Sequence, residues 1–148
     1  MSLRALAWVI CIVYLVGVRV GAKGDGGMRA KTVAHADGSY TEVITDEEEM
    51  ISRVTTFDAT GKVLGKMLNR LGSNFEPLKS YTYDPAGKPL YWTELKHDSR
   101  GRLREAIEYT PRNQFIRRMV FSYDTAGKLA NVRTFDSNGH EIVAPKKH

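Results

Sequence analysis

Hydrophobic and polar residues alternate along most of the chain after residue 30, and short polar turns interrupt the alternation. Residues 81–92 show this most clearly: an alternating run ends at Tyr83, Asp-Pro-Ala-Gly-Lys follows, and a second alternating run leads to Trp92. A period of two is typical of a strand with one side covered. The pattern, rich in Thr, Tyr, Val, Ile and Phe, predicts β-hairpins.

The turn sequence, an aromatic residue or His followed by Asp-x-x-Gly, occurs five times. Asp at its first position can accept hydrogen bonds from backbone amides two residues on, which favours a type I turn. Gly three residues later supplies the positive φ that closes such a turn with a bulge. The predicted turn-defining residues are Asp58, Gly61, Asp84, Gly87, Asp98, Gly101, Asp124, Gly127, Asp136 and Gly139.

These hairpins predict an all-β fold, an antiparallel meander of about nine or ten strands that forms a single domain over residues 31–143. A shorter turn, Asp37-Gly38, predicts two more strands over 31–35 and 39–44. The turn geometry sets Tyr83 opposite Pro89 and Tyr81 opposite Tyr91. Strict alternation then predicts one aromatic-rich core side: Phe57, Val63, Tyr81, Tyr83, Tyr91, Leu95, Leu103, Ile107, Tyr109, Phe121, Tyr123, Leu129 and Phe135. The other side holds Leu64, Leu90, Trp92, Ala106, Val120, Val132 and Ile142 among polar residues.

Two segments fit either a helix or a strand. In residues 46–53, Thr45 with Glu48 resembles a capping box, and apolar residues follow at helical spacing. In residues 62–71, five apolar residues also have the helical period, and Gly72 could end a helix. The hairpin repeat favours a strand over 62–69, whereas residues 46–53 are left open between a short helix and a turn with a strand.

The turns also carry a family resemblance. Tyr83-Asp84-x-x-Gly87 and Tyr123-Asp124-x-x-Gly127 resemble the YD repeats of RHS proteins and teneurins, and the resembling region spans about residues 53–143. In that family the repeated strands run on into a large β-sheet shell. Five units are too few to close such a shell, so the resemblance implies hairpin structure.

The N-terminal segment has the features of a secretory signal. A basic start precedes an apolar run over residues 5–18, and Val20-Gly21-Ala22 offers small residues for cleavage. We predict a signal peptide over residues 1–22, a flexible Gly-rich lead-in over 23–30 and a disordered tail over 144–148. The protein is then exported, to a periplasm, a cell surface or the extracellular space. In the alternative, the segment stays uncleaved and is the chain's only contact with a membrane.

The net charge and cysteine content of the chain that remains after signal-peptide cleavage limit the classes of function. Lys plus Arg falls from 22 to 20 while Asp plus Glu stays at 17, which leaves a net charge of +3, too low for a nucleic-acid binder. The only cysteine, Cys11, lies within the signal. An exported chain without disulfides favours a bacterial envelope.

No residue pattern indicates catalysis, a metal site or a cofactor. Each turn Asp stands alone without the dense spacing of a calcium loop, and the four histidines are too scattered for zinc. The mature chain has no cysteine and no nucleophile-elbow or phosphate-loop motif. Glu105 and Glu108 point to opposite sides of one strand. An envelope enzyme is therefore the least favoured interpretation.

Adjacent aromatic residues are the candidate ligand contacts. Tyr91 and Trp92 must face opposite sides of a strand, and Trp92 is either a stacking platform for sugar rings or packed under its neighbours. A basic fringe able to attract an anionic polymer comprises Arg100, Arg102, Arg104, Arg112, Arg117 and Arg118. We predict a non-catalytic binding or structural module of the cell envelope that contacts a glycan or a protein. The alternative is an immunity or antitoxin-like protein that masks a toxin, and open sheet edges allow self-association in either case.

Overall fold

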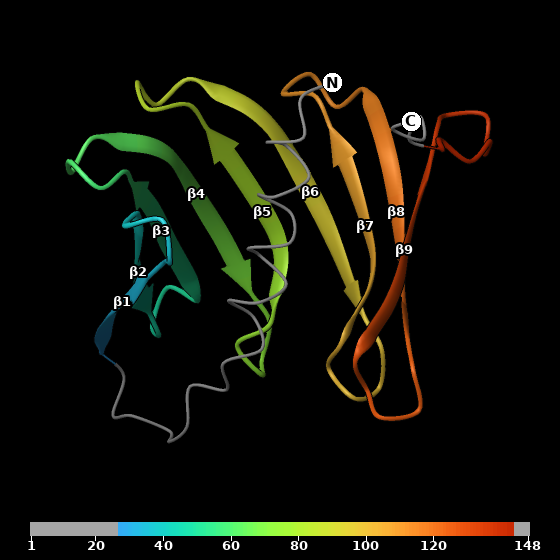
Figure 1. Cartoon of the computed structure of the whole chain (residues 1–148), viewed down its shortest axis with the longest axis horizontal. Helices are drawn as coiled ribbons and strands as arrows, with labels where there is room; N and C mark the ends of the chain where they lie inside the picture. Colours follow the sequence, from blue (N-terminus) through green and yellow to red (C-terminus); the bar gives the residue numbers. More distant parts are fainter. Residues whose placement is uncertain (1–26, 144–148) are drawn as a thin grey trace.

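A computed structural model describes residues 27–143, and these residues form one nine-stranded antiparallel sheet in which each strand pairs with the next along the chain (Figure 1). The predicted all-β meander is confirmed. No helix of the described residues is long and apolar enough to cross a membrane. The strands are β1 (Met28–Ala34), β2 (Tyr40–Asp46), β3 (Ile51–Phe57), β4 (Val63–Leu71), β5 (Pro77–Tyr83), β6 (Pro89–His97), β7 (Leu103–Tyr109), β8 (Phe115–Tyr123) and β9 (Leu129–Phe135).

The ends of the chain are described only in part. The predicted signal peptide (1–22), the first residues of the predicted lead-in and the predicted tail (144–148) lie outside the described residues. The lead-in predicted over 23–30 extends too far, because β1 begins at Met28. Backbone pairing of Met28 with Asp46 of β2 extends the strand back to the end of the Gly-rich stretch.

Eight turns share one five-residue geometry. The first residue donates its N–H to the carbonyl of the fifth, and the fourth donates to the carbonyl of the first, as in Asp84 to Lys88 at 2.9 Å and Gly87 to Asp84 at 3.0 Å. Two of these turns carry other residues at the Asp and Gly positions: Gly72 with Phe75, and Thr110 with Asn113. With them included, turns from Asp58 to Asp136 begin alternately 14 and 12 residues apart. Strands of nine and seven residues accordingly alternate from β4 to β9.

The two segments with helical spacing are strand and turn. Residues 63–71 form β4, as the hairpin repeat predicted. Residues 47–50 form the turn between β2 and β3, in which Oδ1 of Asp46 accepts hydrogen bonds from the N–H groups of Glu48 and Glu49 at 3.1 and 3.0 Å. These two bonds satisfy amides of the turn, and residues 51–57 are a strand because they pair with β2 on one side and with β4 on the other.

A β-bulge follows each turn from β3 to β9 and changes the predicted register. The pairing of Tyr83 with Pro89 is as predicted, but Leu90 has no partner, so Tyr91 lies opposite Thr82 and Trp92 lies opposite Tyr81. The predicted pairing of Tyr81 with Tyr91 is therefore wrong. The extra residue after each turn shifts the alternation by one position, which moves every later side chain to the other side. In the described strands, the residues skipped at these bulges and left without a cross-strand partner are Leu64, Leu78, Leu90, Arg104, Ile116 and Ala130.

The single aromatic core side predicted from alternation is consequently divided between two sides. We call them the buried side and the solvent-facing side. Tyr91, Leu95, Leu103, Phe121, Tyr123 and Leu129 belong to the buried side, whereas Phe57, Val63, Tyr81, Tyr83, Ile107, Tyr109 and Phe135 belong to the solvent-facing side. Ala106, predicted on the polar side, is 1% exposed on the buried side.

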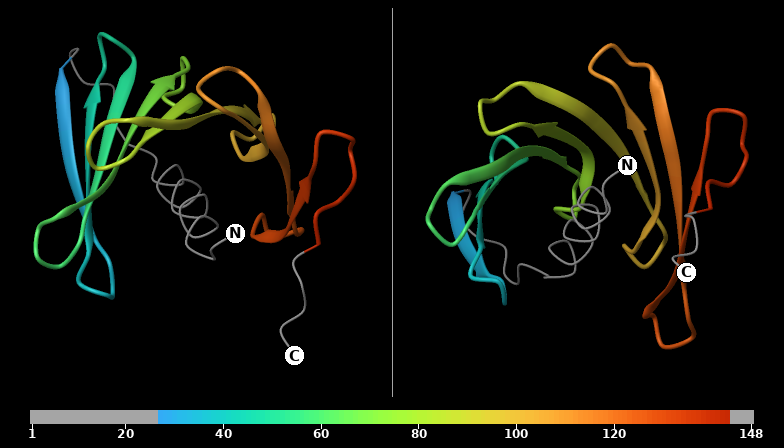
Figure 2. Two further views of the ribbon diagram at one scale, coloured as in Figure 1. Left: turned by 90° about the horizontal axis from the view of Figure 1, so that it is seen from above. Right: turned by 45° about the horizontal axis from the view of Figure 1, so that its top comes forward.

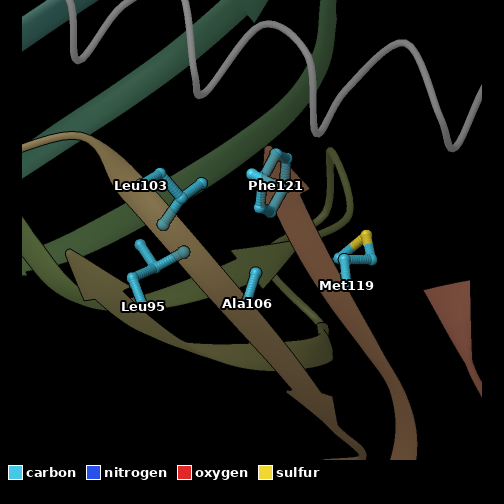
Figure 3. Close-up of a cluster of buried hydrophobic side chains, with 5 residues drawn as sticks. All are labelled: Leu95, Leu103, Ala106, Met119 and Phe121. Carbon is cyan, nitrogen blue, oxygen red and sulfur yellow. The ribbon is translucent and has the colours of Figure 1, made fainter. Parts of the chain in front are cut away.

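The sheet is curled, so that it has a concave and a convex side (Figure 2). Curling crowds the side chains of the concave side, which is the buried side. A compact apolar cluster lies there on β6, β7 and β8 (Figure 3), and it consists of Leu95, Leu103, Ala106, Met119 and Phe121. Tyr123 and Leu129 pack against this cluster. The cluster gives β6, β7 and β8 a packed apolar layer on the buried side.

Candidate binding face

A row of four aromatic rings crosses the solvent-facing side on four consecutive strands. Tyr81, Trp92, Tyr109 and Phe115 are successive cross-strand partners from β5 to β8. Ring centroids are 6.4 Å apart between Tyr81 and Trp92, with planes inclined by 30°, and 4.4 Å apart between Trp92 and Tyr109, with planes inclined by 18°. The ring of Phe115 meets Tyr109 edge-on at 6.3 Å. We call these four residues the aromatic ladder.

Trp92, a predicted ligand contact, is held at the centre of the ladder. Its Nε1–H donates to Oδ1 of Asn113 at 3.0 Å, and Nζ of Lys79 lies 5.2 Å from its ring centroid. The 4.4 Å to Tyr109 nearly equals the ~4.8 Å between neighbouring strands, so the rings stand side by side with their faces toward one another. A ligand would therefore meet the outer edge of Trp92 and not its face.

Tyr91, the other predicted contact, lies on the buried side. It stands opposite Thr82, next to the charged pair of Glu108 and Arg117. Burial raises the pKa of the Tyr91 hydroxyl above its ordinary value, and the negative charge of Glu108 acts in the same direction. Tyr91 and Trp92 thus face opposite sides and cannot form one site.

A row of polar side chains crosses the buried side from β2 to β8. Its members are successive cross-strand partners: Thr45, Ser52, Asn69, Ser80, Thr93, Glu108 and Arg117. Ser80 is 0% exposed and donates its hydroxyl to Oδ1 of Asn69 at 2.7 Å. Internal hydrogen bonds of this kind offset the cost of burying polar groups.

Glu108 and Arg117 close that row with a buried ion pair. Nε of Arg117 donates to Oε2 of Glu108 at 2.6 Å, and Nη2 donates to Oε1 at 3.1 Å. Their side chains are only 3% and 8% exposed. Arg117 is therefore not part of the basic fringe predicted for it, because the carboxylate of Glu108 occupies its guanidinium.

The turn carboxylates serve the backbone of their own turns. Oδ1 of Asp98 accepts from the N–H groups of Arg100 and Arg102, both at 2.9 Å. These bonds hold the pKa of Asp98 below its usual value, and backbone bonds do the same for Asp136. The pKa of Asp58 is lowered first by the hydrogen bond from the Thr60 hydroxyl and then by the N–H of Lys62. Over residues 27–143, no group of three or more His, Cys, Asp or Glu is placed to hold a metal ion.

His97 occupies the position before Asp in its turn, where the other repeats have Tyr or Phe. Both of its ring nitrogens are buried, and neither has a hydrogen-bond partner among the described residues. It lies on the buried side opposite Leu103. Burial lowers the pKa of its imidazole, while Glu76 and Asp98 act in the opposite direction. His97 is therefore held toward the neutral form.

The sequence singles out Trp92 as a candidate contact but not the ladder residues beside it or the polar row, because the bulges decide which residues meet across strands. Glu108 and Arg117 stand nine positions apart in a hairpin, and this spacing does not indicate a pair until the register is known.

Comparison with family models gave no match, and no curated protein matched the chain.

Proposed function

We propose that the protein is an exported, non-catalytic binding module of the cell envelope that binds a glycan on the solvent-facing side of its sheet. The aromatic ladder is the observation that carries this proposal. Four rings on consecutive strands form an apolar row across the sheet, on the side away from the core. Tyr and Trp suit such a surface because each combines a large apolar body with a polar group.

The ladder is also rigid, which favours binding. Trp92 is fixed by Asn113 and by two neighbouring rings, so little side-chain freedom remains to be lost when a ligand docks. The expected contacts are ring edges and Tyr hydroxyls and not a single exposed ring face. This geometry suits an extended chain of sugars that lies across several strands. Export rests on the N-terminal sequence, and protein recovered outside the cytoplasm should begin at Lys23.

A glycan array probed with the exported protein tests the proposal. Tyr109→Ala should abolish binding, because it removes the ring between Trp92 and Phe115. Tyr40→Ala is the matched control: it deletes another stacked ring of the sheet, 4.8 Å from Phe57, outside the ladder. Circular dichroism must show that both variants are folded. Equal binding by Tyr109→Ala and the unmodified protein would exclude the ladder as the site.

The open edges of the sheet favour a second candidate, a protein partner of the immunity or antitoxin kind. Within residues 27–143, β1 pairs only with β2, and β9 pairs only with β8 apart from one bridge between Phe135 and Glu141. An unpaired edge can accept a strand from another protein. Co-purification of one protein, lost when Lys31 or Val132 is replaced by Pro, together with no binding on the array, would favour this candidate.

A further inference from the structure

The cations of the solvent-facing side fall into two groups. Toward the C-terminus most are paired with acids: Lys96 and Arg118 both contact Glu105, at 3.1 and 3.3 Å, and Arg133 contacts Glu141 at 2.8 Å. The exposed Arg104 at the β7 bulge is the exception among the described strand residues. On β3, β4 and β5 the cations are not paired. Four exposed residues there form no ion pair with any described residue: Arg53, Lys66, Arg70 and Lys79. We call these four the basic patch.

The register gathers the basic patch around one apolar residue. Lys66 and Arg70 lie two positions before and after Leu68 on β4, on the same side of the sheet. Arg53 stands opposite Leu68 on β3, which places it diagonal to both. Residues diagonal across neighbouring strands are about 7–8 Å apart at their Cα atoms, so long side chains reach one another.

The patch also places two residues of like charge opposite each other. Arg70 stands directly opposite Lys79, and like charges in this position destabilise a sheet. The nearest acids on this side are Glu94, opposite Lys79, and Glu42, on β2 next to β3, and neither forms an ion pair with the patch. A bound anion would remove this repulsion.

The patch is continuous with the aromatic ladder. Tyr81, the first ring of the ladder, stands opposite Leu68, and Lys79 lies over the ring of Trp92. One ligand crossing from β3 to β7 would therefore meet four cations and then a row of rings. A polymer of sugar rings that carries carboxylates or other acidic groups has both complementary features, charge and ring surface.

We propose that the ligand is an acidic polysaccharide, and that Arg53, Lys66, Arg70 and Lys79 bind its anionic groups while the aromatic ladder contacts its rings. This inference rests on the proposed glycan-binding function and names the class of glycan. Nucleic acid is less favoured, because the predicted mature chain has a net charge of only +3. The patch gives binding a salt dependence that the ladder alone would not give.

Polygalacturonate and its fully methyl-esterified form provide a matched test, since the two polymers share a backbone and differ in charge. The exported protein should bind polygalacturonate at least tenfold more tightly, and added salt should weaken this binding. Lys66→Gln with Arg70→Gln should reduce affinity for polygalacturonate about tenfold, as expected for the loss of two exposed charge contacts. The matched control is Lys88→Gln with Lys128→Gln, which removes two exposed turn cations outside the patch and should change affinity less than twofold.

The outcomes separate this inference from the function on which it rests. Equal binding of the charged and esterified polymers would contradict the proposal of an anionic ligand but would leave the proposed glycan binding unaffected. Binding of no glycan on the array would overturn both. Tighter binding to single-stranded DNA, or to vesicles of anionic phospholipid, than to polygalacturonate at the same salt would replace the polysaccharide by that ligand. Unchanged affinity of the Lys66→Gln, Arg70→Gln variant for polygalacturonate would exclude these two residues from the binding site.

Discussion

Asn113 accepts a hydrogen bond from Nε1 of Trp92 at 3.0 Å while its own backbone has a φ of 63°. The side chain thus ties the turn between β7 and β8 to the middle of the aromatic ladder on β6. Glycine would adopt this backbone conformation more easily but has no side chain to accept the bond. The departure from Gly at this turn therefore has a structural reason.

Phe75 is the useful contrast, because it has a φ of 60° at the same turn position and a side chain that is 41% exposed. A left-handed conformation costs a non-glycine residue about 1–2 kcal/mol. Phe75→Gly should therefore raise the free energy of unfolding by about 0.5 kcal/mol, after allowing for the greater freedom of glycine in the unfolded chain. Asn113→Gly should lower it, because the Trp92 indole loses its partner. Urea denaturation of both variants measures the difference, and equal effects would show that the hydrogen bond contributes nothing.

Gly87 tests the repeated turn itself. Its φ is +87°, and a Cβ added there would meet no atom within 4 Å, so an alanine at this position suffers from backbone strain alone. Gly87→Ala should lower the free energy of unfolding by about 1 kcal/mol. Gly27→Ala is the control, since Gly27 also has open space but no positive φ. Thermal unfolding should rank the two variants, and a neutral Gly87→Ala would refute the turn explanation.

The strands and turns could be predicted because they depend on local chemistry. Asp and Gly punctuate the chain, and residues between them alternate. The Asp-x-x-Gly motif does not mark the turns at Gly72–Glu76 and Thr110–Gln114, where Phe75 and Asn113 replace glycine. The long gaps between copies of the motif, one of them with Pro111 and Asn113, indicate turns of another chemistry there. That these turns share the five-residue geometry of the others, and so complete the alternation of 14 and 12 residues, could not be predicted from the sequence.

The sides of the sheet could not be predicted by counting, because each bulge reverses the parity of the following strand. Trp92 and Tyr91 could be separated, since adjacent residues always face opposite ways. Which of them would join Tyr81 could not be known without the bulge at Leu90. The candidate binding face therefore emerged only from the register, although its central residue was identified from the sequence.

The Glu108–Arg117 pair should be critical to stability, because both charges are buried. Glu108→Gln leaves the Arg117 guanidinium without a counter-charge and should lower the free energy of unfolding by about 3–5 kcal/mol. Glu105→Gln on the same strand is the control: its partners Lys96 and Arg118 are exposed, so the loss should be about 1 kcal/mol or less. Urea denaturation tests both.

Replacing both members of the pair separates charge from packing. Glu108→Leu with Arg117→Met removes both charges and keeps most of the volume, so this double variant should be more stable than Glu108→Gln. A double variant as unstable as the single one would show that the contribution of the pair is packing and not charge.

His97 makes stability depend on pH in a definite direction. Burial lowers the folded-state pKa of its imidazole below the ordinary value of about 6.5, so the unfolded chain binds the proton more readily. The contribution of neutral His97 to the free energy of unfolding is therefore complete above pH 6.5 and is lost as the pH falls from there through the folded-state pKa.

His97→Phe tests this dependence, because it places an aromatic residue at this position and removes the two buried ring nitrogens that lack partners among the described residues. The free energy of unfolding, measured by urea denaturation between pH 7.5 and 5, should fall for the unmodified protein and stay nearly level for His97→Phe. His140→Phe, at an exposed turn position, should keep the slope. If His97→Phe keeps it too, the imidazole does not titrate with folding.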